Sequence, residues 1–314
     1  MTDTNKFILD LINNNKGIKE ICHILNISEK QLYVRIKQII NYGYQLEPSY
    51  NSNSDIYYKV IKEFYTPNEN HISIKMPSSH KEFRFLVISD NHIGNIDSDM
   101  DLLKIVYEYA SKNGINIIFN CGDLIDGVYS SDRKNINNIY GQLETIIKKY
   151  PYDKNINNFV LFGNHDYHSL HYDGLDISKR INSVRYDLIP IGYGESLVNV
   201  KEDNFLIRHE LSVVDTPNVG IDPKLMILGH GHMMKTKVYE KFCIGAPTLS
   251  YVSTNKKKEI LPGFIDMTLH LEKGKFEFVE AHHMIITPKV YEASVSRCRI
   301  KKMYNNNYND KGKK

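Results

Sequence analysis

Hydrophobic residues recur at intervals of three or four in three consecutive segments at the start of the chain, the spacing of one face of an α-helix. Their apolar positions are Phe7, Ile8, Leu11 and Ile12; Ile18, Ile21, Ile24 and Leu25; and Leu32, Ile36, Ile39 and Ile40. Breaks fall at Gly17 and at Asn26–Ser28, and Ser28 with Gln31 forms a capping-box start for the third helix. The pattern predicts a small helical domain over residues 1–45.

The stretch from Ile18 to Ile40 resembles the helix-turn-helix of many DNA-binding regulators, with a short helix, a tight turn and a longer helix. On the longer helix, phosphate contacts are expected from Lys30, Arg35 and Lys37, and base-edge contacts from Gln31 and Gln38. The alternative is that these side chains are the solvated face of a helical bundle or of a protein-docking module.

Residues 46–81 contain Pro, Ser and Asn with short alternating pieces at Tyr57–Val60 and His71–Lys75, and we expect a linker or a wing there. A second domain is expected over residues 82–288. Residues 289–314 are predicted to be a flexible basic tail, because the end of the chain is rich in Lys and Asn and poor in apolar residues.

Inside residues 82–288, apolar runs repeatedly end in potential metal ligands. These runs are Phe83–Ser89, Ile115–Asn120, Asn158–Phe162, Phe205–Arg208 and Leu225–Leu228. Helical stretches such as Ser98–Asn113 and Asn135–Tyr150 alternate with them, which indicates an α/β fold with buried strands. Because ligands in such sheets bind beyond the carboxyl ends of strands, the polar residues there are expected to converge on one site.

Four blocks carry these polar residues. They are Asp90-Asn91-His92, Gly122-Asp123-Leu124-Ile125-Asp126, Gly163-Asn164-His165-Asp166 and Gly229-His230-Gly231-His232, and His209 lies between the last two. Taken singly, an Asp-x-His is usually a surface turn and a Gly-Asp is usually a helix start. A pair of histidines at a strand end, in contrast, is poorly explained by packing.

In this order, the blocks resemble those of the calcineurin-like metallophosphoesterase superfamily, over about Phe83 to Val279. The resemblance implies a four-layer αββα sandwich, with two β-sheets face to face and helices outside. It also implies that one metal is held by Asp90, His92 and His232, and the other by Asn164, His209 and His230. Asp123 would bridge both metals, His165 would be catalytic, and Asp126 would orient the His165 ring.

The donor types support two divalent cations of the transition series. Mixed carboxylate, amide and imidazole donors suit Mn²⁺, Fe or Zn²⁺ better than Mg²⁺ or Ca²⁺, and Mn²⁺ is our first expectation. Such a pair activates a metal-bridging hydroxide as the nucleophile for attack on phosphorus. His165 would stabilise the leaving oxygen. We leave His168, His171, His282 and His283 out of the metal site, because no motif position requires them.

Composition says more about the class and location of the protein than about its substrate. Hydrophobic residues make up 41% of the chain and charged residues 25%, as in globular proteins, and the net charge of +3 leaves the partner open. No apolar run approaches the roughly 20 residues that span a bilayer, and Met1–Asp10 lacks a signal-peptide pattern, so we expect a cytoplasmic protein without a membrane partner. Four scattered cysteines, Cys22, Cys121, Cys243 and Cys298, are expected to be reduced.

Three functions fit these observations. The Gly-His-x-His ending and compact motif spacing are similar to repair exonucleases of the SbcD type and phage-type DNA phosphoesterases, which favours a DNA phosphodiesterase or nuclease tethered by the helix-turn-helix. A phosphodiesterase or phosphatase acting on a small nucleotide is the first alternative, with the helical domain serving for homodimerisation or docking. The second is a DNA-binding regulator whose phosphoesterase domain is silent.

Overall fold

The computed structural model describes residues 2–41, 44–50, 56–63, 71–127, 138–173, 175–209, 223–238, 241–252 and 260–300. The chain divides into two units, one of Met1–Asn68 with His168–Asp176 and the other of Glu69–Tyr167 with Ile177–Lys314. Among the described residues, no helix combines the length and the apolar character needed to span a membrane.

Three helices of the first unit occupy the stretches in which the hydrophobic pattern predicts them: α1 Asp3–Asn13, α2 Ile18–Leu25 and α3 Glu29–Asn41. Their buried stripes include Ile8, Ile12, Ile21, Leu32 and Ile36. The capping box is confirmed, because the Ser28 N–H donates to Gln31 Oε1 at 2.9 Å and the Gln31 N–H donates to Ser28 Oγ at 3.3 Å. Strands β1 Tyr44–Tyr50 and β2 Ile56–Glu63 follow as an antiparallel hairpin.

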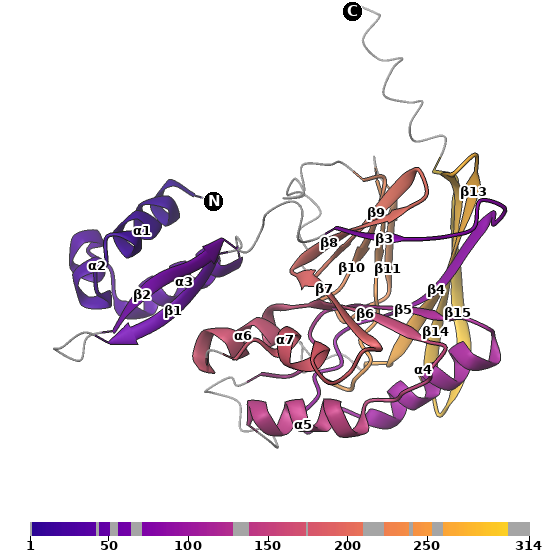
Figure 1. The fold of residues 1–314 in the computed structure, drawn as a ribbon, viewed down its shortest axis with the longest axis horizontal. Coiled ribbons are helices and arrows are strands. Elements are labelled where there is room, and N and C mark those ends of the chain that lie inside the picture. Colours follow the sequence, from indigo (N-terminus) through magenta and orange to yellow (C-terminus); the bar gives the residue numbers. More distant parts are fainter. Residues whose placement is uncertain are drawn as a thin grey trace, which may run out of the picture. The chain divides into compact units, whose positions relative to one another are not determined.

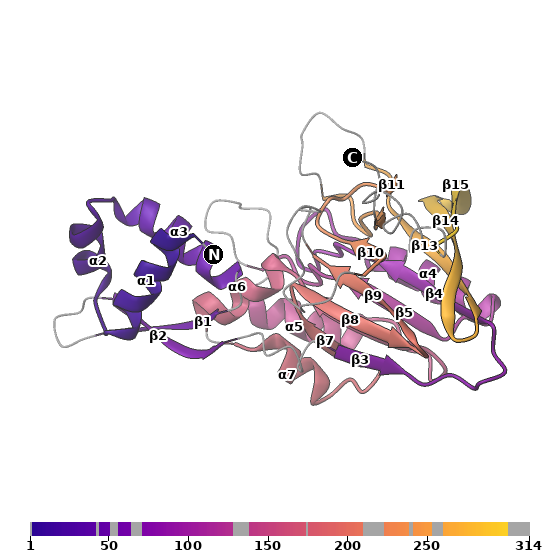
Figure 2. The same cartoon turned by 90° about the horizontal axis from the view of Figure 1, so that it is seen from above.

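The second unit contains two sheets. The seven-stranded sheet has the order β15-β14-β13-β4-β5-β6-β7, and the six-stranded sheet has the order β11-β12-β10-β9-β8-β3. Strands β4 to β7 are parallel neighbours, whereas β13, β14 and β15 are antiparallel. Figure 2 shows β3, β8, β9 and β10 of the six-stranded sheet side by side.

The bounds of the strands are β3 His71–Ile74, β4 Glu82–Ile88, β5 Ile117–Cys121, β6 Asn157–Phe162, β7 Leu188–Tyr193, β8 Glu195–Val200, β9 Asp203–Arg208, β10 Leu225–Leu228, β11 Lys235–Val238, β12 Phe242–Gly245, β13 Gly263–Glu272, β14 Lys275–Thr287 and β15 Lys289–Cys298. The bounds of the helices are α4 Met100–Lys112, α5 Ile139–Lys149, α6 Asn164–Asp173 and α7 Ile177–Asn182.

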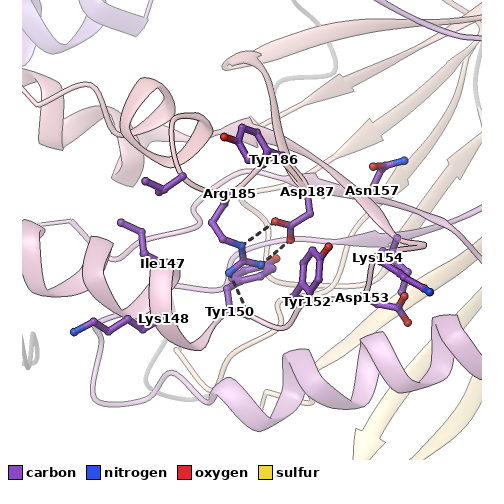
Figure 3. A pocket seen from close by; sticks show the side chains of 12 residues that line it. Ile147, Lys148, Tyr150, Tyr152, Asp153, Lys154, Asn157, Arg185, Tyr186 and Asp187 are labelled. Atoms are coloured by element: carbon purple, nitrogen blue, oxygen red, sulfur yellow. Dashed lines mark hydrogen bonds and ion pairs between the residues drawn. The ribbon is translucent and has the colours of Figure 1, made fainter.

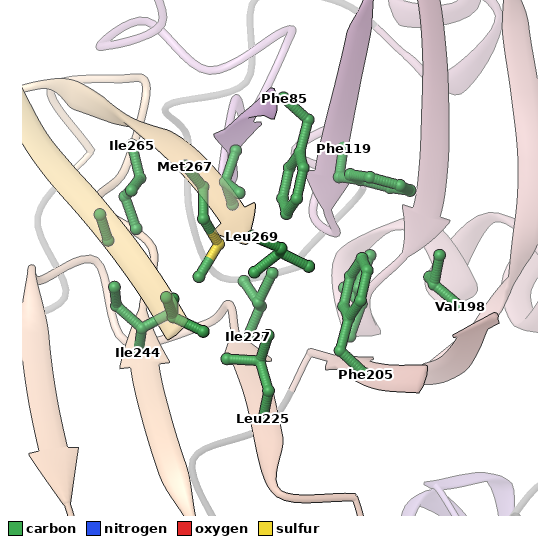
Figure 4. Close-up of a cluster of buried hydrophobic side chains, with 14 of the residues drawn as sticks. Phe85, Phe119, Val198, Phe205, Leu225, Ile227, Ile244, Ile265, Met267 and Leu269 are labelled. Carbon is green, nitrogen blue, oxygen red and sulfur yellow. The ribbon is translucent and has the colours of Figure 1, made fainter. Parts of the chain in front are cut away.

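The core lies between the two sheets. Phenylalanines from both sheets meet there, with the Phe85 and Phe205 rings stacked at 5.5 Å and Phe119 edge-on to both. Aliphatic side chains such as Ile227 and Leu269 fill the rest (Figure 4). Helices α4 and α5 lie below the seven-stranded sheet in Figure 1. The described residues thus show a mixed α/β fold in which two sheets pack face to face.

Two expected boundaries differ from the structure. Strand β3 pairs in parallel with β8, so the sheet begins before residue 82, inside the stretch expected to be linker. Its Ile72 and Ile74 pack against the core. Strand β15 pairs with β14 where a flexible tail was expected from residue 289, and the fully buried Ile300 follows it. The polar composition of an edge strand resembles that of a tail, because most of its side chains face solvent.

Candidate metal centre

The polar blocks sit where strands of both sheets end. Asp90 and His92 follow β4, Asp123 follows β5, Asn164 and His165 begin α6 after β6, His209 follows β9, and His230 and His232 follow β10. Strands β4, β5 and β6 are parallel neighbours in one sheet, and β9 and β10 are parallel neighbours in the other. Because the carboxyl ends of parallel neighbours share an edge, these blocks converge.

Asp90, His92 and His232 form the first donor group, with ligand atoms all within 4.8 Å of one another. The Nε2 atoms of His92 and His232 are 3.1 Å apart, and His232 Nε2 is 3.4 Å from Asp90 Oδ1. Two nitrogens bound to one ion at about 2.1 Å would lie roughly 3 to 3.5 Å apart. All three residues are buried, so the geometry suits one cation.

Asp123, His209 and His230 form the second donor group. His209 Nε2 lies 3.0 Å from Asp123 Oδ2, and the His209 and His230 rings are nearly perpendicular at 5.2 Å. The backbone N–H of His165 donates to the other carboxylate oxygen of Asp123 at 2.9 Å. This bond brings the start of α6, where Asn164 lies, to the second group.

Backbone carbonyls fix the tautomer of three of these histidines. Nδ1–H donates to a carbonyl oxygen in each case: His165 to Asp126 at 2.7 Å, His209 to Cys121 at 2.6 Å and His232 to Val252 at 2.8 Å. With Nδ1 carrying the hydrogen, Nε2 is the nitrogen that can offer a lone pair. For the proposed ligands His209 and His232, this is the arrangement expected of imidazoles that bind cations through Nε2.

Asp126 does not act on His165 in the way the sequence suggested. Its carboxylate Oδ1 is 3.8 Å from His165 Nδ1 but 3.2 Å from His92 Nδ1. The backbone carbonyl of Asp126, in contrast, holds the His165 ring. The residue therefore supports two histidines, one through its side chain and one through its main chain, and the second contact is invisible in the sequence because any residue has a carbonyl.

Five of the proposed ligands adopt left-handed backbone conformations. Among the described residues, nine that are not glycine have positive φ, and five of these are Asp90, His92, Asp123, His230 and His232, with φ from 47° to 66°. Such a conformation costs a non-glycine residue about 1 kcal/mol or more. Hydrogen bonds hold it in place, including Asp90 N–H to Gly122 O at 2.9 Å and His92 N–H to Asp123 O at 3.0 Å.

Three glycines of the polar blocks surround the His209 ring. A Cβ on Gly122, Gly163 or Gly229 would lie 2.3, 2.5 or 2.7 Å from an atom of that ring. Each distance is shorter than any ordinary contact, so a side chain at any of the three would displace the imidazole. The sequence shows only that these glycines belong to the polar blocks, and the structure shows which side chain their backbone approaches.

Asp166, for which the sequence suggested no role, ties two of the ligand loops together. Its buried carboxylate accepts backbone N–H bonds from Gly163 at 2.7 Å, Leu124 at 3.1 Å and Ile125 at 2.9 Å. Burial and the nearby Asp123 charge raise the pKa of Asp166 to about 7. The only signal for it in the sequence was its place as the fourth residue of the Gly163 block.

Comparison with protein-family models matches residues 83–236 to the calcineurin-like phosphoesterases. These residues form a calcineurin-like phosphoesterase domain. The domain is of the metal-dependent phosphoester hydrolase class. Its match includes all four polar blocks and His209.

Solved structures from several organisms are similar to the chain at low sequence identity. A zinc complex of Vps29 from Entamoeba histolytica is 14% identical, with a TM-score of 0.40, and covers 69% of this chain and 99% of its own. Vacuolar protein sorting 29 from Cryptosporidium parvum is 16% identical, with a TM-score of 0.42, and covers 70% and 100%. YfcE, a phosphoesterase from E. coli, is 14% identical, with a TM-score of 0.40, and covers 69% and 100%. None of the curated proteins matches the chain.

Charges within the two donor groups of the calcineurin-like domain favour ionisation of their carboxylates. Burial opposes ionisation of Asp123, but nearby histidines, above all His209, hold its pKa well below the ordinary value. Burial would lower the pKa of His209, but the Asp123 charge outweighs it and raises that pKa to about 10. A cation binding at His209 Nε2 must therefore displace a proton, so cation binding and proton release are coupled.

The residues present fit divalent cations. Asp90 Oδ1 is buried and makes no hydrogen bond, which is costly for an ionised carboxylate unless a cation faces it. Burial opposes ionisation of Asp90, yet its ion-pair contact with His232 and the nearby histidine charges lower its pKa. The two donor groups thus combine ionised, buried carboxylates with imidazoles that are buried except for the half-buried His230.

Other residues considered from the sequence have different surroundings. His282 contacts Glu280 and Glu292, and buried His283 faces Ser296, so both have partners away from the donor groups. The side chains of His168, His171 and Lys37 lie outside the described residues. In the first unit, Lys30 is exposed, whereas Gln31 caps α3 and Gln38 Oε1 accepts from Asn5 at 3.0 Å and lies 3.5 Å from Arg35.

The calcineurin-like domain also borders a cavity of about 500 Å³ at the opposite edge of the seven-stranded sheet, where β6 and β7 begin. Figure 3 shows Arg185 paired with Asp187 at its centre, with Tyr152 and Tyr186 nearby. The Arg185 guanidinium also donates to the carbonyls of Ile146, Tyr150 and Pro151. With its donors so engaged, Arg185 holds the loop together, and none of the residues proposed as metal ligands lines this cavity.

Proposed function

We propose that the protein is a two-metal phosphodiesterase that cleaves DNA. The observation that supports hydrolysis is the pair of donor groups, Asp90–His92–His232 and Asp123–His209–His230, which lie at neighbouring strand ends and are buried except for the half-buried His230. In this proposal Asn164 completes the second group and Asp123 is shared between the two. Two divalent cations held there, Mn²⁺ by preference, would supply a water of lowered pKa and positive charge for the phosphate oxygens.

The contacts of His165 indicate which of its ring nitrogens is available to the substrate. Its Nδ1–H is committed to the Asp126 carbonyl, and its ring packs edge-on against His92 at 4.5 Å between centroids. Its side chain is 22% exposed, more than those of Asp123, Asp126 and His92, and its Nε2 lies 3.9 Å from Asp123 Oδ2. In its doubly protonated form, with hydrogens on both ring nitrogens, His165 would donate a hydrogen bond or its Nε2 proton to the leaving oxygen and return to the neutral Nδ1–H form.

The choice of DNA rests on the first unit. Lys30 on α3 is exposed and Arg35 is partly exposed, as phosphate contacts require. Gln31 and Gln38, however, already serve the fold through the α3 cap and the contact with Asn5. The two cationic side chains are available to contact phosphates, whereas the amides are engaged within the first unit. We therefore propose that the first unit binds the DNA backbone and recognises little of the base sequence.

A substrate panel tests the proposal. Full-length protein with Mn²⁺, Zn²⁺ or Mg²⁺ is assayed on bis-p-nitrophenyl phosphate, p-nitrophenyl phosphate, cyclic nucleotides, RNA, and single-stranded and duplex DNA. We expect DNA cleavage that His165→Asn abolishes. Cleavage of bis-p-nitrophenyl phosphate without any nucleic acid would contradict DNA as substrate, and preference for a free nucleotide would favour the small-nucleotide alternative.

The role of the first unit needs its own variants. Lys30→Ala with Arg35→Ala should weaken DNA binding and reduce the salt dependence of binding by about one unit of slope for each phosphate interaction that is removed. Turnover of bis-p-nitrophenyl phosphate should not change. Lys6→Ala, which removes an exposed lysine of α1, is the matched control. Equal DNA affinity in the wild type, the double variant and the control would argue for a docking module.

A further inference from the structure

The segment from Thr248 to Val252 is hydrogen-bonded to two residues of the first donor group, Asp90 and His232. The hydroxyls of Thr248 and Ser250 both donate to the backbone carbonyl of Asp90, each at 2.9 Å. The backbone carbonyl of Val252 accepts from His232 Nδ1 at 2.8 Å. Tyr251 therefore stands between two residues that are each bonded to a proposed ligand of the same cation.

Tyr251 is itself held in place by a third bond. Its backbone N–H donates to the carbonyl of Asp97 at 2.9 Å, in the loop that continues from His92. Its neighbour Ser250 is fully buried, yet the Tyr251 residue is 48% exposed. Three consecutive residues are thus held, Ser250 through its hydroxyl and Tyr251 and Val252 through the backbone, while the Tyr251 side chain remains open to solvent.

Two further apolar side chains are exposed on the segments around this donor group. Ile96, next to Asp97, is 61% exposed, and Met233, next to His232, is 48% exposed. Single exposed apolar residues are common on protein surfaces. These three instead belong to segments that carry, or are bonded to, Asp90, His92 and His232.

We propose that Tyr251, with Ile96 and Met233, forms the subsite for a nucleobase next to the scissile phosphate. The inference rests on the proposed cleavage of DNA and adds which residues bind the base of the substrate. The donor groups handle the phosphate, and the exposed phenol ring offers a face for stacking that accepts any base. Met233 adds an adaptable, polarisable contact and Ile96 an apolar one. Binding of this kind selects nucleosides without selecting sequence.

The test compares two single-stranded oligonucleotides with the same phosphodiester backbone, an oligothymidylate and its abasic analogue. The wild-type protein with Mn²⁺ should cleave the base-containing strand with a kcat/KM higher on the order of ten-fold. Tyr251→Ala should remove this preference by lowering kcat/KM for the oligothymidylate alone, whereas Tyr251→Phe should keep it. Tyr186→Ala, at an 84% exposed tyrosine of the cavity at the opposite sheet edge, is the control and should match the wild type.

Methyl p-nitrophenyl phosphate, which carries no base, reports whether the metal centre remains intact. The metal content of Tyr251→Ala should equal that of the wild type, and Tyr251→Leu, which retains bulk without an aromatic ring, serves if the alanine variant does not fold. Equal cleavage of the two strands by the wild type would overturn the subsite while leaving the proposed function standing. Turnover of the methyl ester with no cleavage of either strand would overturn both, and so would no turnover of any substrate.

Discussion

Nδ1 of His165 donates a hydrogen bond to the backbone carbonyl of Asp126 at 2.7 Å, whereas the Asp126 carboxylate lies nearer to His92, at 3.2 Å. The two functional groups of one residue therefore serve two histidines with different tasks. One histidine is a proposed ligand and the other is the proposed donor to the leaving oxygen.

Substitution of Asp126 should separate these tasks. Asp126→Asn retains the carbonyl, so His165 keeps its orientation, but the charge beside His92 is lost. We expect metal content to persist and turnover of bis-p-nitrophenyl phosphate to fall about ten-fold or more. Asp123→Ala, which removes the only carboxylate of the second donor group, should lose metal and activity together. Metal analysis after gel filtration distinguishes them, and equal metal loss would contradict the assigned roles.

Gly163→Ala should abolish activity for a steric reason. The new Cβ would meet Asp123 Oδ1 at 2.3 Å and His209 Cδ2 at 2.5 Å, so the second donor group must shift. The matched control is Gly114→Ala, where φ is +67° but nothing lies within 4 Å of the new Cβ. That control should cost about 1 kcal/mol of stability from backbone strain and leave turnover unchanged. Normal metal content and turnover in Gly163→Ala would refute the steric account.

The ion pair between Glu195 and Arg208 should matter for stability. These residues are cross-strand partners on β8 and β9, with 2% and 6% exposure, and Arg208 Nη2 lies 2.6 Å from Glu195 Oε2. Glu195→Ala leaves a buried guanidinium without this carboxylate, and we expect a loss of about 3 to 5 kcal/mol. Urea denaturation followed by circular dichroism measures it. The double variant Glu195→Leu with Arg208→Met should be more stable than the single variant.

The β14–β15 hairpin should depend on pH through His282. Burial would lower the pKa of His282, but its contacts with Glu292 and Glu280 outweigh burial and raise that pKa. A raised pKa means that the contribution to stability is complete below the ordinary value and is lost as pH rises through the folded-state value. Thermal denaturation between about pH 5 and 9, a range that brackets the ordinary histidine pKa, should show this loss in the wild type. A His282→Gln variant that showed the same loss would exclude His282 as its cause.

The stability of the same hairpin should also fall at low pH. Hydrogen bonding from Arg297 is the largest influence on Glu280 and brings its pKa to about 2. With the folded-state pKa depressed, this contribution is present above the ordinary value of 4.5 and is lost as pH falls toward 2. Because both groups lie near the surface, added salt should weaken both effects, and thermal denaturation at low and high salt measures the difference.

The sequence by itself determined the helices of the first unit, five strands of the second unit and the polar blocks that follow those five strands. Spacings of three and four residues marked α1, α2 and α3, and apolar runs marked β4, β5, β6, β9 and β10 within a few residues of their ends. These features are readable because they are local: periodicity states which side of an element faces a core, and the residue after a buried run lies at its end. The order of the blocks along the chain was likewise enough to suggest the calcineurin-like family.

Only the tertiary structure decided what those residues contact. His230 N–H bonds Asp90 Oδ2 across 140 positions, and Arg84 pairs with Asp266 across 182. Strand β3 looked like linker and β15 like tail because edge strands have few buried side chains, and their partners β8 and β14 had to be known. The glycines around His209, the side chain of Asp126 on His92 and the placement of Tyr251 share this cause. Each is a contact between segments distant in sequence, and no local spacing encodes it.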